Sequence, residues 1–154
     1  MSEIQRIVDQ LQRAFEGNAW HGPSVTEVLA GVTAHGAAAK PVAAAHGIWE
    51  LVHHIAAWEA IVRRRIEGEV IVEVADEEDW PRVDDTSEAA WRVSLDELER
   101  GHELLRDAIV GMKESRLEET VPGKDHSFYV LVHGVVQHDL YHAGQIALLK
   151  RAYF

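Results

Sequence analysis

Cysteine is missing from this chain of 154 residues. Disulfides and thiolate metal ligands are therefore excluded, and with them every zinc-finger arrangement built on cysteine pairs. Any metal site must be made from His, Asp and Glu side chains. The chain has 10 histidines and 26 acidic residues from which such a site could be built.

Basic residues are also few, because 15 Lys and Arg stand against 26 Asp and Glu, and the formal net charge is -11. Such a chain repels a phosphate backbone unless its basic residues are segregated into a patch. One compact basic cluster, Arg63-Arg64-Arg65, stands near the end of a helical pattern with acids close behind it. We expect a solvated helix end that stabilises the negative end of the helix dipole, and no nucleic-acid partner.

Long apolar runs are absent as well, and the sequence predicts no secretory signal. No stretch approaches the roughly 18 apolar residues of a membrane helix. The amino-terminal MSEIQRIVDQ lacks a basic segment followed by an apolar core. We therefore expect no membrane association and a cytoplasmic location. Hydrophobic residues at 47% and charged residues at 27% are typical of a folded globular protein, and the length predicts a single domain over residues 1–154.

Apolar residues recur at helical spacing in four long segments. The first helix is predicted to open with a capping box of Ser2 and Gln5 and to end at Gly17. The other three are predicted from Gly47 or Ile48 to Gly68, from Asp85 or Thr86 to Met112, and from near Ser127 almost to Phe154. Four long helices joined by polar loops indicate an all-α four-helix bundle.

Two of the predicted connections are long. Residues 17–47 contain a short extra helix before the second long helix, predicted from a capping box of Ser24 and Glu27 to about Val32. Within residues 69–85, VIVEV could form a short extended piece and DEEDWP a turn or loop. Because both connections can span the length of a bundle, we expect long crossovers, which allow the second and third long helices to run parallel.

His138 and His142 stand four residues apart in the last helical pattern, HDLYHAGQIALLKR. Residues at this spacing lie on one face of a helix, one turn apart, so both rings can reach one point. Zinc-binding helices use such a pair. In a chain with 10 histidines, however, two unlinked surface histidines explain the pair equally well. A third ligand would decide between the two interpretations.

A polar stripe of His46, Glu50 and His54 runs at four-residue intervals through the second long helical pattern, HGIWELVHHIAAWE. Burying such groups among Trp, Ile and Val is costly unless they are paired or coordinate an ion. By itself, His54 is typical of a hydrogen-bonded core histidine, and His46 of a helix start in contact with water. If the two helices face each other, His54, His138 and His142 supply three imidazoles and leave a fourth position open, as catalytic zinc sites do.

Together, WELVHHIAAWE and QHDLYHAGQIALLK resemble the DinB family of small four-helix metalloenzymes, which is unrelated to the DNA polymerase of the same name. The likeness spans most of the chain in helix order, and its specific part is confined to residues 46–59 and 138–149. The matching positions are Tyr141, His142, Gly144, Gln145 and Ile146 of a YHxGQI ending, Asp79, Trp80 and Pro81 of a DWP motif, and His46, Ile48, Trp49, Glu50 and Leu51 of a helix start.

The resemblance implies that His54, His138 and His142 bind one divalent metal ion, usually zinc or nickel. It further implies a metal-dependent transferase or hydrolase-like enzyme that activates water or a low-molecular-weight thiol toward a small-molecule substrate. The alternatives are a non-catalytic metal- or ligand-binding stress-response bundle and a metal-free interaction module. Homodimers are common among small helical bundles, so this chain could also form a homodimer.

Three further residues are expected beside the site, although the sequence assigns no catalytic residue. Gln145 is seven residues from His138, nearly on the ligand face, and can hydrogen-bond to a ligand or to another helix. Glu50, one turn from His54, can accept a hydrogen bond from an imidazole N–H or act as a base, and we favour the acceptor. His46 is a pocket candidate, and Trp80, in an acidic loop, can cover a cleft. The histidines without a spacing partner are His21, His35, His102, His126 and His133.

Overall fold

The structure is a computed structural model in which residues 1–153 are described. Its helices are α1 (Glu3–Phe15), α2 (Val25–Leu29), α3 (Ala34–Ala38), α4 (Ile48–Ile66), α5 (Asp76–Asp79), α6 (Glu88–Val110), the 3-10 helix η1 (Glu114–Glu118) and α7 (Phe128–Tyr153). No strand forms within residues 1–153, where a single antiparallel bridge joins Thr120 and Ser127. The all-α class predicted from the sequence is confirmed.

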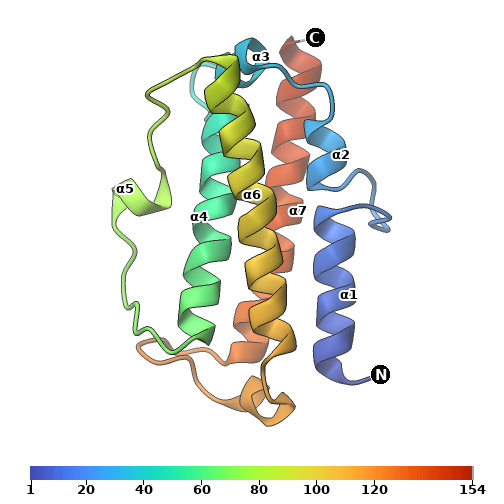
Figure 1. The fold of residues 1–154 in the computed structure, drawn as a ribbon, viewed down its shortest axis with the longest axis vertical. Coiled ribbons are helices and arrows are strands. Elements are labelled where there is room, and N and C mark those ends of the chain that lie inside the picture. The colour runs from blue at the N-terminus through green and yellow to red at the C-terminus, as the bar shows by residue number, and fades with distance from the viewer. Residues whose placement is uncertain (154) are drawn as a thin grey trace.

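The four long helices α1, α4, α6 and α7 lie side by side (Figure 1). α4 packs against α6 and α7, and α1 packs against the same two helices. α1 and α7 run toward one end of the molecule, whereas α4 and α6 both run toward the other. The connection between α4 and α6 must therefore return along the whole length of the molecule, and it carries α5 past the side of α4 (Figure 1).

Both predicted capping boxes are present at the starts of α1 and α2. In α1 the Ser2 Oγ accepts a hydrogen bond from the Gln5 N–H at 3.2 Å, and the Gln5 Oε1 accepts one from the Ser2 N–H at 2.8 Å. Each such bond satisfies a backbone N–H that the first helical turn leaves free, and losing the cap costs about 1 kcal/mol. These two helix starts were readable from the sequence because the caps are local.

Several short elements differ from the sequence-based expectation. The extra helix ends at Leu29, and a further short helix, α3, follows in the Ala-rich segment, where the Thr33 hydroxyl accepts from the Gly36 N–H. The acidic segment after VIVEV forms one helical turn, α5, and η1 was not predicted either. VIVEV forms no strand, because the carbonyls of Ile71 and Val72 accept hydrogen bonds from side chains of other segments instead of from a neighbouring strand.

The buried core has two apolar halves separated by one polar layer. One half includes Ile55 of α4 and Leu98 of α6, and the other includes Val62 and Leu105 of the same helices. Between these levels lie Glu59, His102 and Asp139, all buried, one from each of α4, α6 and α7.

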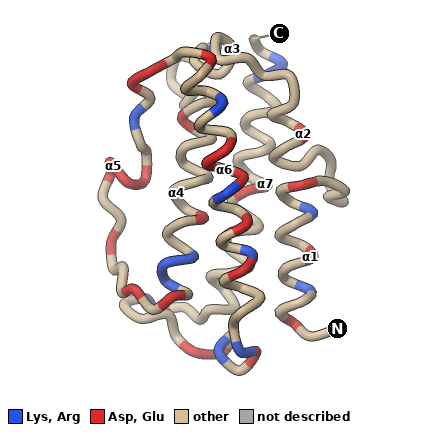
Figure 2. The backbone as a smooth tube through the Cα atoms, in the orientation of Figure 1, with Lys and Arg blue, Asp and Glu red and all other residues tan. Residues whose placement is uncertain are grey.

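Acidic residues are concentrated on α6 and along the connection between α4 and α6, whereas α7 carries few, and basic residues gather near the carboxyl end of α4 and in short stretches of other segments (Figure 2). Within residues 1–153, no helix has the length and apolar character needed to cross a membrane.

Candidate metal centre

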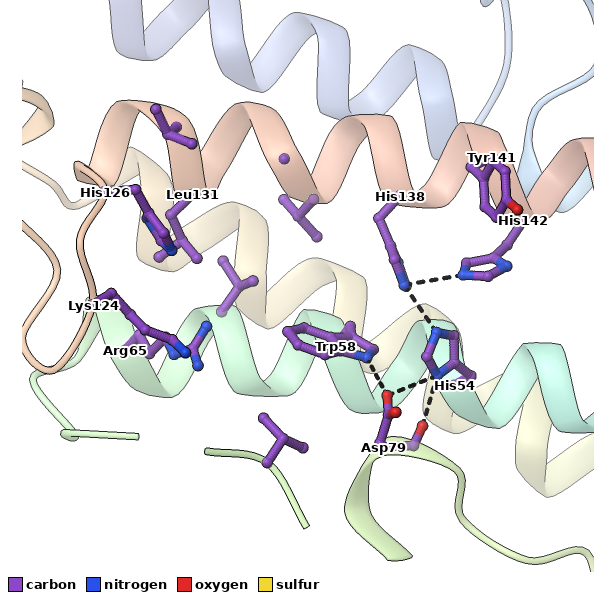
Figure 3. Close-up of a pocket in the computed structure, with 15 residues that line it drawn as sticks. His54, Trp58, Arg65, Asp79, Lys124, His126, Leu131, His138, Tyr141 and His142 are labelled. Carbon is purple, nitrogen blue, oxygen red and sulfur yellow. Dashed lines mark hydrogen bonds and ion pairs between the residues drawn. The ribbon is translucent and has the colours of Figure 1, made fainter. Parts of the chain in front are cut away.

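Three imidazoles meet where α4 faces α7. The Nε2 atoms of His54 and His138 lie 3.0 Å apart, and those of His138 and His142 lie 3.1 Å apart. One ring nitrogen from each residue lies within 4.8 Å of the other two. His54 points from α4 toward the pair on α7 (Figure 3). The four-residue spacing on α7 places its two rings one above the other, and the packing of α4 against α7 supplies the third.

The hydrogen bonds of His54 and His142 fix which ring nitrogen carries the proton. His54 Nδ1 lies 2.6 Å from the backbone oxygen of Asp79, and because a carbonyl can only accept, Nδ1–H must be the donor. His142 Nδ1 lies 2.6 Å from the Gln145 side-chain oxygen, which likewise accepts. In both residues Nε2 therefore presents its lone pair toward the other imidazoles. Metal-binding histidines are held by the same kind of contact.

Burial keeps these imidazoles neutral. It lowers the pKa of His54, His138 and His142, and the hydrogen bonds that His54 donates to Asp79 and His142 donates to Gln145 offset this only in part. Neutral imidazole is the form that binds a metal ion. Three lone-pair nitrogens facing one point repel each other unless a proton or a cation lies between them, and one proton satisfies only one contact.

The donor set fits a first-row divalent ion. A tetrahedral ion 2.0–2.1 Å from each nitrogen would separate the nitrogens by roughly 3.3 Å, close to the 3.0 and 3.1 Å seen here. Imidazole suits zinc and nickel among other such ions. The same three residues line a pocket of about 720 Å³, so a fourth ligand position can be reached from the pocket.

The crossover between α4 and α6 builds one wall of the site. The Trp80 ring stacks on His54 with centroids 3.8 Å apart, and on its other side it stacks on His46 at 3.5 Å. The Trp58 indole N–H donates to the Asp79 carboxylate at 2.7 Å, which holds Asp79 beside His54 (Figure 3). Trp80 thus covers one face of His54, and it does not line the pocket beside the three histidines.

Of the three residues predicted to lie beside the histidines, one hydrogen-bonds to a site histidine and two do not. Gln145 contacts His142, as described, whereas no hydrogen bond or ion pair joins Glu50 to His54. Glu50 instead accepts from the Gly47 N–H at 2.7 Å and pairs with Lys40 at 2.9 Å, so it caps the start of α4. Asp79, not Glu50, accepts the hydrogen bond from His54. His46 lies outside Trp80 with its side chain 48% exposed, and is one layer removed from the three imidazoles.

A second cluster, which the sequence analysis missed, lies in the polar layer of the core. His102 Nδ1 lies 2.9 Å from the Glu59 carboxyl, and the Phe15 ring stacks on His102 at 3.7 Å. Donor atoms of Glu59, His102 and Asp139 also lie within 4.8 Å of one another. Burial raises the pKa of Glu59 to about 8, and burial next to Glu59 raises that of Asp139 as well. Because all three residues are sealed from solvent, a substrate cannot reach this cluster, and the three-histidine site is the better candidate for chemistry.

Comparison with known proteins identifies a family. The model of the DinB superfamily matches residues 19–146, which include all three histidines. No curated protein and no solved structure matches the chain.

Proposed function

The chain belongs to the DinB superfamily, and we propose that it is a metal-dependent enzyme whose one divalent ion, zinc or nickel, is held by His54, His138 and His142. The observation that carries the proposal is the approach of three Nε2 atoms on the wall of an open pocket. An ion held there would supply Lewis acidity that brings the pKa of a coordinated water or thiol toward neutral pH.

The residues around the site have supporting roles. Asp79 and Gln145 keep the Nδ1 proton on His54 and His142, so that each Nε2 stays available. Trp80 excludes water from one face of His54. The pocket gives a small-molecule substrate, or a low-molecular-weight thiol, room to approach the same point. We therefore propose a transferase or hydrolase-like reaction in which the thiol or water is the nucleophile.

The alternative is a stress-response bundle in which an ion only braces the fold. Bracing sites are closed by a fourth protein ligand, whereas catalytic sites keep one position open. Within residues 1–153 the group that contains the three histidines has no fourth His, Asp or Glu donor. Asp79 lies on the Nδ1 side of His54, turned away from the Nε2 atoms, and is engaged with Trp58. This favours catalysis over bracing.

We also propose a domain organisation, a cellular location and an oligomeric state for the protein. We assign the arrangement in Figure 1 to a single four-helix-bundle domain with long crossovers. We further propose that it works in the cytoplasm, alone or as a homodimer, without a nucleic-acid or membrane partner. The net charge of -11 supports the exclusion of nucleic acid.

The test combines metal content with activity. Protein purified without a histidine tag is analysed for metals, and one divalent ion per chain is expected. Metal-loaded and chelator-stripped protein are then assayed for the transfer of cellular thiols to electrophiles and for ester hydrolysis. Activity that appears only in the loaded protein, and that His142→Ala removes, is the expected result. Metal without any activity would favour the bracing alternative, and a metal-free protein would contradict the proposal.

A further inference from the structure

The pocket that begins at the three histidines ends at a basic group formed by Arg65, Lys124 and His126 (Figure 3). Arg65 is only 2% exposed, although arginine is seldom buried without a partner. The sequence predicted a solvated helix end for Arg63, Arg64 and Arg65, and for Arg65 this was wrong. Arg65 follows Val62 by three residues and so falls on the buried face of α4.

Its two neighbours show what Arg65 lacks. Arg63 pairs with Glu67 at 2.7 Å, and Arg64 pairs with Glu69 and Glu78. No carboxylate within residues 1–153 lies at ion-pair distance from Arg65. Its one hydrogen bond goes from Nη2 to the backbone oxygen of Ile71 at 3.0 Å, and its buried Nε has no partner. A guanidinium has five N–H donors, so most of its binding capacity is unused.

Lys124 adds a second positive charge without a counterion. Its Nζ donates to the backbone oxygen of Val72 at 2.7 Å and pairs with no carboxylate in the described part of the chain. The one acidic residue that lines the pocket is Asp79, which stands at the histidine end and is bonded to Trp58. This end of the pocket therefore concentrates positive charge in a protein whose net charge is -11. Such an arrangement is complementary to an anion.

Between the two ends, the pocket is apolar. Val62, Val74, Leu131 and Val135 line it together with the Trp58 ring. About three helical turns separate Arg65 from His54, which is roughly 16 Å along the axis of α4. A molecule that reaches both ends must be elongated, with a charged group at one end and an apolar middle.

We propose that the pocket binds a substrate with a carboxylate on an apolar stem, and that Arg65 and Lys124 hold the carboxylate while the other end of the molecule reaches the three histidines. A carboxylate fits the planar fork of a guanidinium with two parallel hydrogen bonds. The placement of the reacting end rests on the proposed function. Binding of the carboxylate does not, because Arg65 and Lys124 are remote from the histidines.

Octanoate and octanamide test this inference, because they share a chain and differ in charge. Calorimetric titration of chelator-stripped protein is expected to show octanoate binding about tenfold or more tighter than octanamide. Arg65→Met keeps the apolar stem but removes the charge, and it should abolish this preference while leaving octanamide binding unchanged. Arg63→Met is the matched control at a partly exposed position whose charge is paired with Glu67, and it should retain the preference. Should Arg65→Met fail to fold, Lys124→Met, at a partly exposed position, is expected to weaken octanoate binding selectively.

The outcomes separate this inference from the proposed function. Equal affinity for the two ligands in the unaltered protein, or an undiminished preference in Arg65→Met, overturns the inference. The same titration with zinc-loaded protein reveals carboxylate binding at the histidines: octanoate binding that depends on zinc and not on Arg65 also overturns it. If the protein binds no metal but still prefers octanoate in an Arg65-dependent way, the proposed function is wrong and the carboxylate site is supported.

Discussion

His54 and His138 bring their Nε2 atoms to 3.0 Å from one another across 84 positions of sequence. His54 Nε2 carries no proton, because its Nδ1–H donates to Asp79, so the two rings attract each other only if His138 Nε2 carries one. His54 is held by its hydrogen bond to Asp79 and by the Trp80 ring, and His138, which is half-buried on α7, has its ring centroid 5.8 Å from that of Trp58. Neighbouring residues therefore fix the positions of the two imidazoles, as they do in a preformed metal site.

Removal of a single histidine should abolish metal binding. In His138→Ala, two imidazoles remain, and the site loses the nitrogen that lies within 3.1 Å of both others. We expect at least a hundredfold weaker zinc binding, measured by competition with a chromogenic chelator. His133→Ala is the control on the same helix, since His133 faces Glu3. Retention of one tightly bound ion by His138→Ala, with equal affinity, would refute the ligand assignment.

Zinc should also stabilise the folded protein, because an ion that binds only the folded state adds RT ln(1 + [L]/Kd) to its stability. At a hundredfold excess over Kd this is about 2.7 kcal/mol, which corresponds to a rise in Tm of roughly 5–10 °C for a chain of this size. Thermal unfolding followed by circular dichroism, with and without zinc, measures the shift. His142→Ala should show no comparable rise, and an equal rise there would locate the ion elsewhere, with the cluster of Glu59, His102 and Asp139 as the first place to look.

Gln145 is expected to act through His142 and not by contact with the ion. Gln145→Leu removes the acceptor that lies 2.6 Å from His142 Nδ1, and losses of such partners typically weaken metal affinity by about 10–100-fold. Gln145→Glu retains an acceptor and should largely restore the affinity, which a purely structural role would not predict. Gln145 is partly exposed, so the helix should be preserved in both variants. Identical zinc affinity in the unaltered protein and Gln145→Leu would remove Gln145 from the site.

Helical periodicity predicted the long helices. The meeting of the three histidines was expected only if the second and last long helices face each other, and the resemblance to the DinB family implied the full set. The spacing of His138 and His142 is local to α7, and His54 falls in the apolar stripe of α4. Asp79 and Trp80 could not be positioned in this way, because they come from a crossover whose path is set by tertiary contacts. The acceptor for His54 was therefore assigned to Glu50, which is near in sequence, although Asp79 fills that role.

The buried polar layer could have been predicted from titratable residues that stand at apolar positions of the helical pattern. Glu59 stands four residues after Ile55 and three before Val62, at a position where the stripe of α4 predicts an apolar side chain. His102 stands in the same relation to Leu98 and Leu105 on α6. A titratable residue in an apolar stripe is a candidate for a buried pair even without a spacing partner on its own helix. Arg65 on α4 could have been found by the same argument.

Glu59 should make the protein less stable as the pH rises above neutrality. Burial raises its pKa to about 8 from the usual 4.5, so between these values the folded state holds a proton that the unfolded state releases. The stability is therefore highest where both states are protonated, falls as pH rises through this window, and levels off above pH 8. The slope from this group is at most about 1.4 kcal/mol per pH unit.

The buried histidines have the opposite effect at lower pH. Burial lowers the pKa of His54, His102, His138 and His142, so the stability that depends on their neutral forms is lost as pH falls below the ordinary histidine pKa of 6.5. The interval from about pH 7 to pH 8 therefore isolates Glu59 from the histidines. Glu59→Gln keeps the shape and an acceptor for His102 but cannot titrate. Urea unfolding of chelator-treated protein at pH 7 and pH 8 should show a loss of stability that is larger by roughly 1 kcal/mol in the unaltered protein than in Glu59→Gln. The comparison is between the two proteins because the pKa of Asp139 is raised as well, and Asp139 contributes to the loss in both. If both proteins change equally over this interval, Glu59 is already ionised in the folded core, and the positive charge needed to balance it must come from a protonated His102 or from an ion bound in the polar layer.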